Sequence, residues 1–385
     1  MLARTSTATP TGVLHVIDSL GLGGAQAILK DFFEYRTSSG AIFLYALRVV
    51  PGQLKIGHPN VSVNPSSWRF SMAPMLKLRA IVDSCAVDIL HCHLFRAQVF
   101  GYLLKTIFFP RLVLVFHEHG RAVGREGESW IEAMLFRWFL AAAWRSVDAF
   151  VCNSDYTRKR LLEVIPGAAE RVTVAPNPIR VHPRESRTEA RRAARERAGV
   201  PDGSFVVGFA GRLVKRKGWH DFLLAIQRLE HRIPVFFLVA GDGEDREKVE
   251  ACIRELGLEG RGRTLGHVSR MDGFYEALDC FAMPSHWEPA GLVHLEAQGH
   301  AVPVVVSDVS GLNETVHADI DALLFPAGDP AALAERIFRI ASDSELREGL
   351  ASRGHDNAGR FTLDAFGSRL DGLYSTILAE CRHSR

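Results

Sequence analysis

Short apolar runs alternate with longer amphipathic stretches along nearly the whole of this 385-residue chain. In the first half the runs are 12–18, 41–50, 88–93, 111–119 and 148–154, and in the second half they are 205–212, 235–243, 280–285 and 302–308. Runs of this length are typical of buried strands, and the stretches between them are typical of helices. The alternation therefore predicts an α/β fold built from βαβ units with parallel sheets.

The length of the chain favours two domains of about 150–200 residues, because one core rarely serves so many residues. Residues 182–204 are polar, rich in Arg and nearly free of large apolar side chains, as is typical of a domain connection. We therefore expect a first doubly wound domain at 1–180, a linker at 181–204 and a second doubly wound domain at 205–361. A ligand cleft is expected between the carboxyl ends of their strands.

Composition argues against a membrane-spanning, a secreted and a nucleic-acid-binding protein. No uncharged apolar run reaches the roughly 18–20 residues of a membrane-spanning helix, and residues 1–12 lack the apolar core of a signal peptide. We therefore expect a cytoplasmic chain with a disordered lead-in and six reduced cysteines. Residues 1–180 carry 20 Lys and Arg against 13 Asp and Glu. That excess fits either an anionic partner or uneven solvated faces, and no basic run interleaved with aromatic residues indicates nucleic acid.

Two carboxylates stand eight residues apart in EPAGLVHLE, Glu288 to Glu296. Pro289 and Gly291 disfavour a regular helix at Glu288, whereas residues 291–298 are typical of a helix that contains Glu296. Even in a continuous helix, eight residues span about 12 Å. The carboxylate pairs of glycosidases are roughly 5–9.5 Å apart. The spacing therefore favours two contacts to one long ligand over an acid and a base acting on one bond.

A second polar motif, AGRLVKRKG (210–218), follows a predicted strand and carries four cations in a turn. Cations at the carboxyl end of a strand, beside a helix N-terminus, suit a diphosphate. Taken alone, such a run is more often a solvated loop.

Together these motifs resemble the retaining GT-B glycosyltransferases of family 4, which transfer a sugar from a nucleotide-sugar donor. The E-x7-E element and the turn after it are the most specific part of the resemblance. It extends over nearly the whole chain and includes SLGLGGAQ (19–26), HCHLFRAQ (91–98), VFHEHG (115–120), CNSDYTRKRL (152–161), APNPI (175–179), GRLVKRKG (211–218), VAGDGEDREKVE (239–250), LGHV (265–268), MPSHWEPAGLVHLEAQGHAVPVV (283–305) and SGLNETV (310–316).

The resemblance implies a role for each matching residue. Arg212 and Lys217 are expected to neutralise the donor diphosphate as it leaves. Glu296 is expected to bind the ribose hydroxyls, and Glu288 the hydroxyls of the transferred sugar. His117 is expected near the reactive carbon of that sugar, with His119 competing for the role. Further donor contacts are implied for Gly23, Gly24, Gly266, His267, Val268, Gly291, Leu292 and Val293.

The resemblance also implies a fold and a reaction. The fold is GT-B: two Rossmann-like domains face a central cleft, and the last helix, 362–380, packs back on the first domain. The reaction moves a sugar, with retention, from a nucleotide-sugar donor to a glycan or lipid-linked acceptor in cell-surface polysaccharide, lipopolysaccharide or glycolipid assembly. A UDP-sugar is the favoured donor, and no metal or other cofactor is expected. Two alternatives stay open: another GT-B enzyme such as a nucleotide-sugar epimerase, and a binding protein without catalysis.

Three further motifs favour simpler interpretations. Gly21-x-Gly23-x-x-Gln26 is an incomplete dinucleotide fingerprint, and Asp319-Ile320-Asp321 is expected to be a chance DxD in a loop. The pairs His91/His93 and His117/His119 each put both rings on one face of a strand, as metal ligands do. Because no third ligand stands nearby in the sequence, we expect strand-end histidines and no metal site.

Residues 129–145, SWIEAMLFRWFLAAAWR, predict a helix that is apolar over most of its circumference. It is expected to pack in the core on the first sheet. The alternative is an interfacial helix that sets the basic first domain on a membrane and gives it peripheral contact with a lipid-linked acceptor.

Overall fold

The computed structural model describes residues 12–21, 23–36, 41–68, 71–120, 130–184 and 187–383, so the predicted lead-in lies outside them. Contacts divide the chain into two compact units. The first unit comprises Met1–Pro176 together with Phe366–Arg385, and the second comprises Asn177–Ala365.

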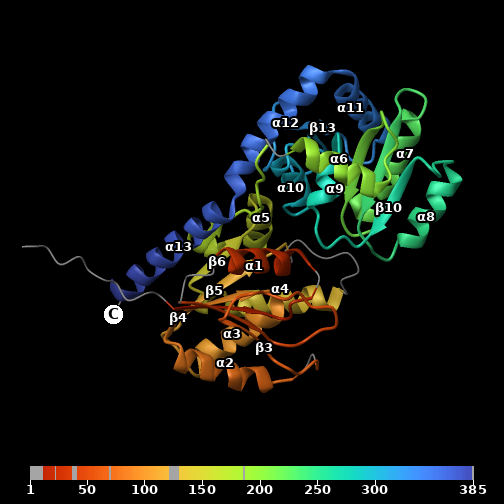
Figure 1. The fold of residues 1–385 in the computed structure, drawn as a ribbon. Helices are drawn as coiled ribbons and strands as arrows, with labels where there is room; N and C mark the ends of the chain where they lie inside the picture. The colour runs from red at the N-terminus through yellow and green to blue at the C-terminus, as the bar shows by residue number, and fades with distance from the viewer. Residues whose placement is uncertain are drawn as a thin grey trace, which may run out of the picture. The chain divides into compact units, whose positions relative to one another are not determined.

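The first unit is built on a seven-stranded parallel sheet in the order β3-β2-β1-β4-β5-β6-β7. Helices α1 and α3 lie on opposite faces of this sheet (Figure 1). The strands are β1 (Gly12–Ile17), β2 (Ile42–Ala46), β3 (Val61–Val63), β4 (Val87–His93), β5 (Val113–Glu118), β6 (Ala149–Cys152) and β7 (Val172–Val174), and the helices are α1 (Gly24–Tyr35), α2 (Ala73–Ser84), α3 (Phe95–Ile107), α4 (Trp130–Ala143) and α5 (Asp155–Val164).

The two faces of the first sheet carry different side chains because alternate residues of a strand point to opposite faces. On one face, Leu90 and Cys92 of β4 join an apolar core with Phe100 of α3 and Phe116 of β5. The other face carries histidines and is covered by α1 and by the part of α13 (Leu363–His383) that belongs to this unit.

The second unit is built on a six-stranded parallel sheet in the order β10-β9-β8-β11-β12-β13. Its strands are β8 (Phe205–Ala210), β9 (Val235–Ala240), β10 (Gly262–Gly266), β11 (Cys280–Met283), β12 (Val304–Ser307) and β13 (Leu323–Phe325), and its helices are α6 (Arg187–Ala198), α7 (Trp219–Leu229), α8 (Arg246–Glu255), α9 (Asp272–Ala277), α10 (Val293–Gly299), α11 (Pro330–Ser342) and α12 (Ser344–Ala358).

The predicted fold class is confirmed. In both units the strand order reverses once, between β1 and β4 and between β8 and β11, which is the doubly wound arrangement of Rossmann-like domains. Every predicted strand is present within a few residues of its expected bounds. Asp329 caps α11, since its carboxylate accepts the N–H groups of Ala331 and Ala332.

Three other predictions concern segments that the structure describes. The polar segment 182–204 contains α6, whose Arg191 and Arg195 pair with Asp279 of the second unit. All six cysteines are free, and four of them are buried. Among the described residues, no helix is long and apolar enough to span a membrane.

Candidate active site

Donor residues predicted from the sequence lie where the strand order of the second sheet reverses. The cation-rich turn follows β8, and Glu288 follows β11, which is the neighbour of β8 in the sheet. In doubly wound sheets, ligands bind outside the carboxyl ends of the strands at this reversal. The structure therefore brings both predicted motifs to the edge of the sheet where such a site is expected.

Lys217 and Glu288 form an ion pair between the loops that follow β8 and β11. Their side chains are only 15% and 9% exposed, so the pair is largely shielded from water. The hydroxyl of Ser285 lies 3.5 Å from the same carboxylate oxygen. Gly218 makes this approach possible, because a Cβ there would lie 1.8 Å from the carbonyl oxygen of Pro284 and its φ is +70°.

Glu296 lies inside α10, as predicted, and has a different partner. The phenol of Tyr275, on α9, donates a hydrogen bond of 2.7 Å to its carboxylate. Burial, and then the neighbouring Glu296 carboxylate, raise the pKa of Tyr275 well above its ordinary value, so the phenol keeps its proton. Glu288 and Glu296 therefore have different hydrogen-bonding partners, Lys217 and Tyr275.

The other donor residues predicted in the second unit lie at the ends of its strands and at the start of α10. Arg212 is exposed two residues after β8, and Gly266 is the last residue of β10. His267 is exposed and Val268 is half-buried in the loop that follows. Gly291, Leu292 and Val293, all half-buried, lead into α10.

In the first unit, Gly23 and Gly24 are exposed at the N-terminus of α1. His117 lies inside β5 and is 1% exposed. Its ring contacts those of His91, His93 and His119. His119, two residues further along, is half-buried.

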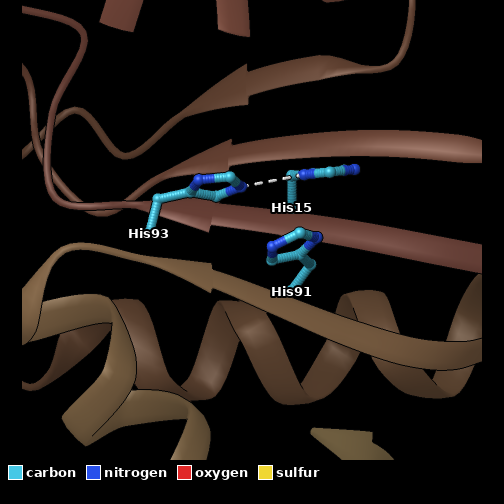
Figure 2. A group of neighbouring side chains, drawn as sticks. All are labelled: His15, His91 and His93. Carbon is cyan, nitrogen blue, oxygen red and sulfur yellow. Dashed lines mark hydrogen bonds between the residues drawn. The ribbon is translucent and has the colours of Figure 1, made fainter. Parts of the chain in front are cut away.

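The same region bears on the expectation that no metal site exists. Both histidine pairs lie on one face of the first sheet. His15 of β1 lies beside His91 and His93 on that face (Figure 2). Potential ligand atoms of His15, His91 and His93 lie within 4.8 Å of one another. A third potential ligand is therefore present, although it stands far away in the sequence.

Two further motifs can now be placed. Both carboxylate oxygens of Asp321 bind His317, one accepting its backbone N–H at 2.8 Å and the other lying 2.6 Å from its ring Nδ1. The carboxylate of Asp321, in the DxD motif, therefore binds a residue of its own loop. Helix α4 buries Phe136, Leu140 and Ala143, so the prediction of core packing is confirmed for one face. It is wrong for the rest of the helix, which exposes Trp130, Ile131, Met134, Leu135 and Trp138.

Sequence reasoning missed several residues of the donor region. Tyr275 lies in the segment MDGFYEA, and nothing in its spacing relates it to Glu296. Ser285 stands three residues before Glu288, and this short spacing is the one signal that could have identified it.

Two protein-family models match the chain. The model for Glycosyltransferase Family 4 matches residues 42–182, and the model for glycosyl transferases group 1 matches residues 190–356. The lipopolysaccharide core biosynthesis glycosyltransferases LpsE and LpsD of Rhizobium meliloti (strain 1021) are 34% and 36% identical over 226 and 163 residues. These matches cover 57% and 42% of this chain and span 62% and 47% of the relatives' lengths.

One solved structure shows the same fold. HepE of Anabaena, in complex with UDP and glucose, is similar to this chain with a TM-score of 0.80 at 22% identity. The similarity covers 94% of this chain and 99% of HepE.

Proposed function

The chain belongs to the group 1, family 4 glycosyltransferases, and from this premise we propose that it transfers a sugar from a nucleotide-diphosphate sugar to a glycan or lipid-linked acceptor. The observation that carries the proposal is the shielded Lys217–Glu288 pair at the strand-order reversal of the second sheet. It puts a cation suited to a phosphate beside a carboxylate suited to sugar hydroxyls.

In the donor complex we expect Arg212 and Lys217 to bind the diphosphate. An ammonium group has three donors, so Lys217 can contact a phosphate oxygen while still bound to Glu288. As the bond between sugar and phosphate breaks, negative charge grows on the leaving diphosphate, and these two cations stabilise it. Glu288 then holds the hydroxyls of the transferred sugar, and Glu296, oriented by Tyr275, holds the ribose.

Retention of anomeric configuration belongs to the same proposal. Glu288 is already bound to Lys217 and lies near Ser285, which favours a binding role over attack on the anomeric carbon. We therefore propose a front-face reaction in one ion-pair-like step, without a covalent intermediate on the protein and without a metal at the donor diphosphate. Proton NMR of the first-formed product tests this, and a product of inverted configuration contradicts it.

A UDP-sugar is the donor we propose, supported by the UDP seen in HepE, whose fold this chain shares. A thermal-shift screen against UDP-, GDP-, ADP- and dTDP-sugars, without and then with Mg²⁺, tests it. A ligand at a hundred times its dissociation constant adds about 2.7 kcal/mol to the stability. We expect a metal-independent shift with UDP-sugars alone, and a shift only with another nucleotide contradicts the donor assignment.

The effect of an acceptor on UDP release distinguishes sugar transfer from an epimerase and from a binding protein. We expect UDP release to rise several-fold when a lipid-linked or glycan acceptor is added. Formation of an epimer of the donor without any acceptor would establish the epimerase instead. Binding with neither outcome, across acceptors of both kinds, would establish a binding protein.

We further propose that α4 rests on an acidic membrane while the first unit meets a lipid-linked acceptor in surface glycan assembly. Trp130 and Trp138 are 73% and 70% exposed on this helix, and the first 180 residues carry an excess of cations. The expected result is flotation of the protein with acidic vesicles and its reduction in Trp138→Ser. Trp68→Ser, at a tryptophan 65% exposed outside α4, is the matched control and should leave flotation unchanged.

A further inference from the structure

Five histidines form one layer on the face of the first sheet that α1 and α13 cover. Parallel register places His15 of β1 opposite His91 of β4, and His93 opposite His117 of β5. Neighbouring rings in this layer have centroids between 4.1 and 5.4 Å apart, and His119 continues it past the end of β5. A grouping of this kind is unusual for a core, where aliphatic side chains would pack without polar atoms.

Aromatic side chains of α1 and α13 cover the histidine layer. Phe32 and Phe33 of α1 present T-shaped contacts to His15, and Tyr374 of α13 does the same to His91. Each neutral imidazole of the layer keeps one nitrogen lone pair.

Hydrogen bonds within the layer leave some of these nitrogens unused. His93 uses both of its nitrogens, with His15 Nδ1 at 2.9 Å and His119 Nε2 at 3.1 Å. Within the described part of the chain, His15 Nε2, His91 Nε2 and both nitrogens of His117 have no hydrogen-bond partner. An unsatisfied buried polar atom costs about 1–3 kcal/mol, so these nitrogens favour a ligand within the layer.

We propose that His15, His91 and His93 bind a divalent transition metal of the zinc class, and that His93 exchanges one of its two ring hydrogen bonds for the metal. Candidate ligand atoms of these rings lie within 4.8 Å of one another on two neighbouring strands (Figure 2). Zn–N bonds of about 2.0–2.1 Å put tetrahedral ligands about 3.4 Å apart, so modest ring rotations complete the site. Three imidazoles suit zinc, cobalt, nickel or copper, whereas magnesium and calcium require oxygen ligands.

Two neighbours support this site. Tyr374 Oη lies 2.6 Å from His91 Nδ1. If Nδ1 carries the proton and donates it to the phenol oxygen, Nε2 is left as a bare lone pair. Metal-bound histidines nearly always have such an outer partner, which fixes the tautomer. His117, whose ring centroid is 5.0 Å from that of His93, can supply the fourth ligand.

The site goes beyond the proposed transfer, since Arg212, Lys217, Glu288 and Glu296 belong to the other unit and need no metal. The test uses the full chain without a polyhistidine tag, stripped with EDTA and titrated with Co²⁺ and then with competing Zn²⁺. We expect one equivalent of Co²⁺ to bind, with the visible absorption bands of tetrahedral cobalt, and Zn²⁺ to displace it. Absence of these bands from the folded protein overturns the proposal.

Variants assign the ligands. His15→Asn and His91→Asn should each lower the affinity for Co²⁺ by at least a hundredfold. His294→Asn changes an equally buried histidine of the second unit and should leave it unchanged. Tyr374→Phe keeps the shape of the core and should lower affinity about 10–100-fold, the range for outer-shell partners. Tyr374→Phe therefore still tests the metal site when a ligand variant fails to fold. Affinity that depends on His119 but not on His15 would contradict this ligand set.

Discussion

Replacing Glu288 by Gln tests whether the Lys217–Glu288 pair both stabilises the fold and binds the sugar. An exposed ion pair contributes about 0–1 kcal/mol, whereas breaking a buried one costs about 3–5 kcal/mol. At 15% and 9% exposure this pair lies near the buried limit. We expect Glu288→Gln and Lys217→Met each to lower the free energy of unfolding by about 2–3 kcal/mol. The double variant should lose little more, which gives a coupling energy of about 2 kcal/mol.

Urea unfolding followed by circular dichroism and tryptophan fluorescence measures the coupling. The matched control is the exposed pair Arg246–Glu250, whose side chains are 54% and 42% exposed and whose coupling should stay below about 0.5 kcal/mol. Calorimetry should also show that Lys217→Met loses UDP binding. Glu288→Gln should keep UDP but lose the extra affinity for the UDP-sugar. A Lys217–Glu288 coupling no larger than that of the control would refute the structural reasoning.

Three shorter predictions concern the same unit. Burial, and then the charge of Lys217, lower the pKa of His294 to about 3. Stability is therefore lost as pH falls from about 6.5 towards 3, and His294→Asn should reduce the slope by about 1.4 kcal/mol per pH unit in urea unfolding between pH 4 and 6. Gly218→Ala, blocked by the carbonyl of Pro284, should lower the melting temperature and weaken UDP binding; unchanged values contradict this. Tyr275→Phe should weaken nucleotide binding about tenfold by calorimetry while costing only about 1 kcal/mol of stability.

Secondary structure was predictable from the sequence for the interior of both sheets and not for their edges. The strands that the apolar runs missed are β3, β7, β10 and β13, which are the outermost strands of the two sheets. An interior strand is buried on both faces and reads as a continuous apolar run. An edge strand such as VSV (61–63) is short and only half-buried, so its sequence does not stand out from a loop.

The residues of the candidate sites also include some that the sequence could predict and some that it could not. Glu288, Glu296 and Lys217 could be predicted because their motifs are local in the chain, and a family resemblance gave them expected roles. His15 could not be identified, because it is one polar residue in an apolar run and lies 76 residues before His91. Only the strand order, which places β1 beside β4, brings these two rings together. The sequence also could not predict which face of α4 is exposed, because a helix that is apolar around most of its circumference can pack on the sheet with any side.

The return of the chain to its first unit has a consequence for its synthesis. Residues from Phe366 onward complete that unit, although the whole second unit is made before them. At roughly 5–20 residues per second, a ribosome needs about 10–40 s to make the intervening residues. During that interval the nascent chain lacks the helix that carries Tyr374, so the histidine layer is only partly covered. A metal ion would then meet an open face, and the final helix would close over it afterwards.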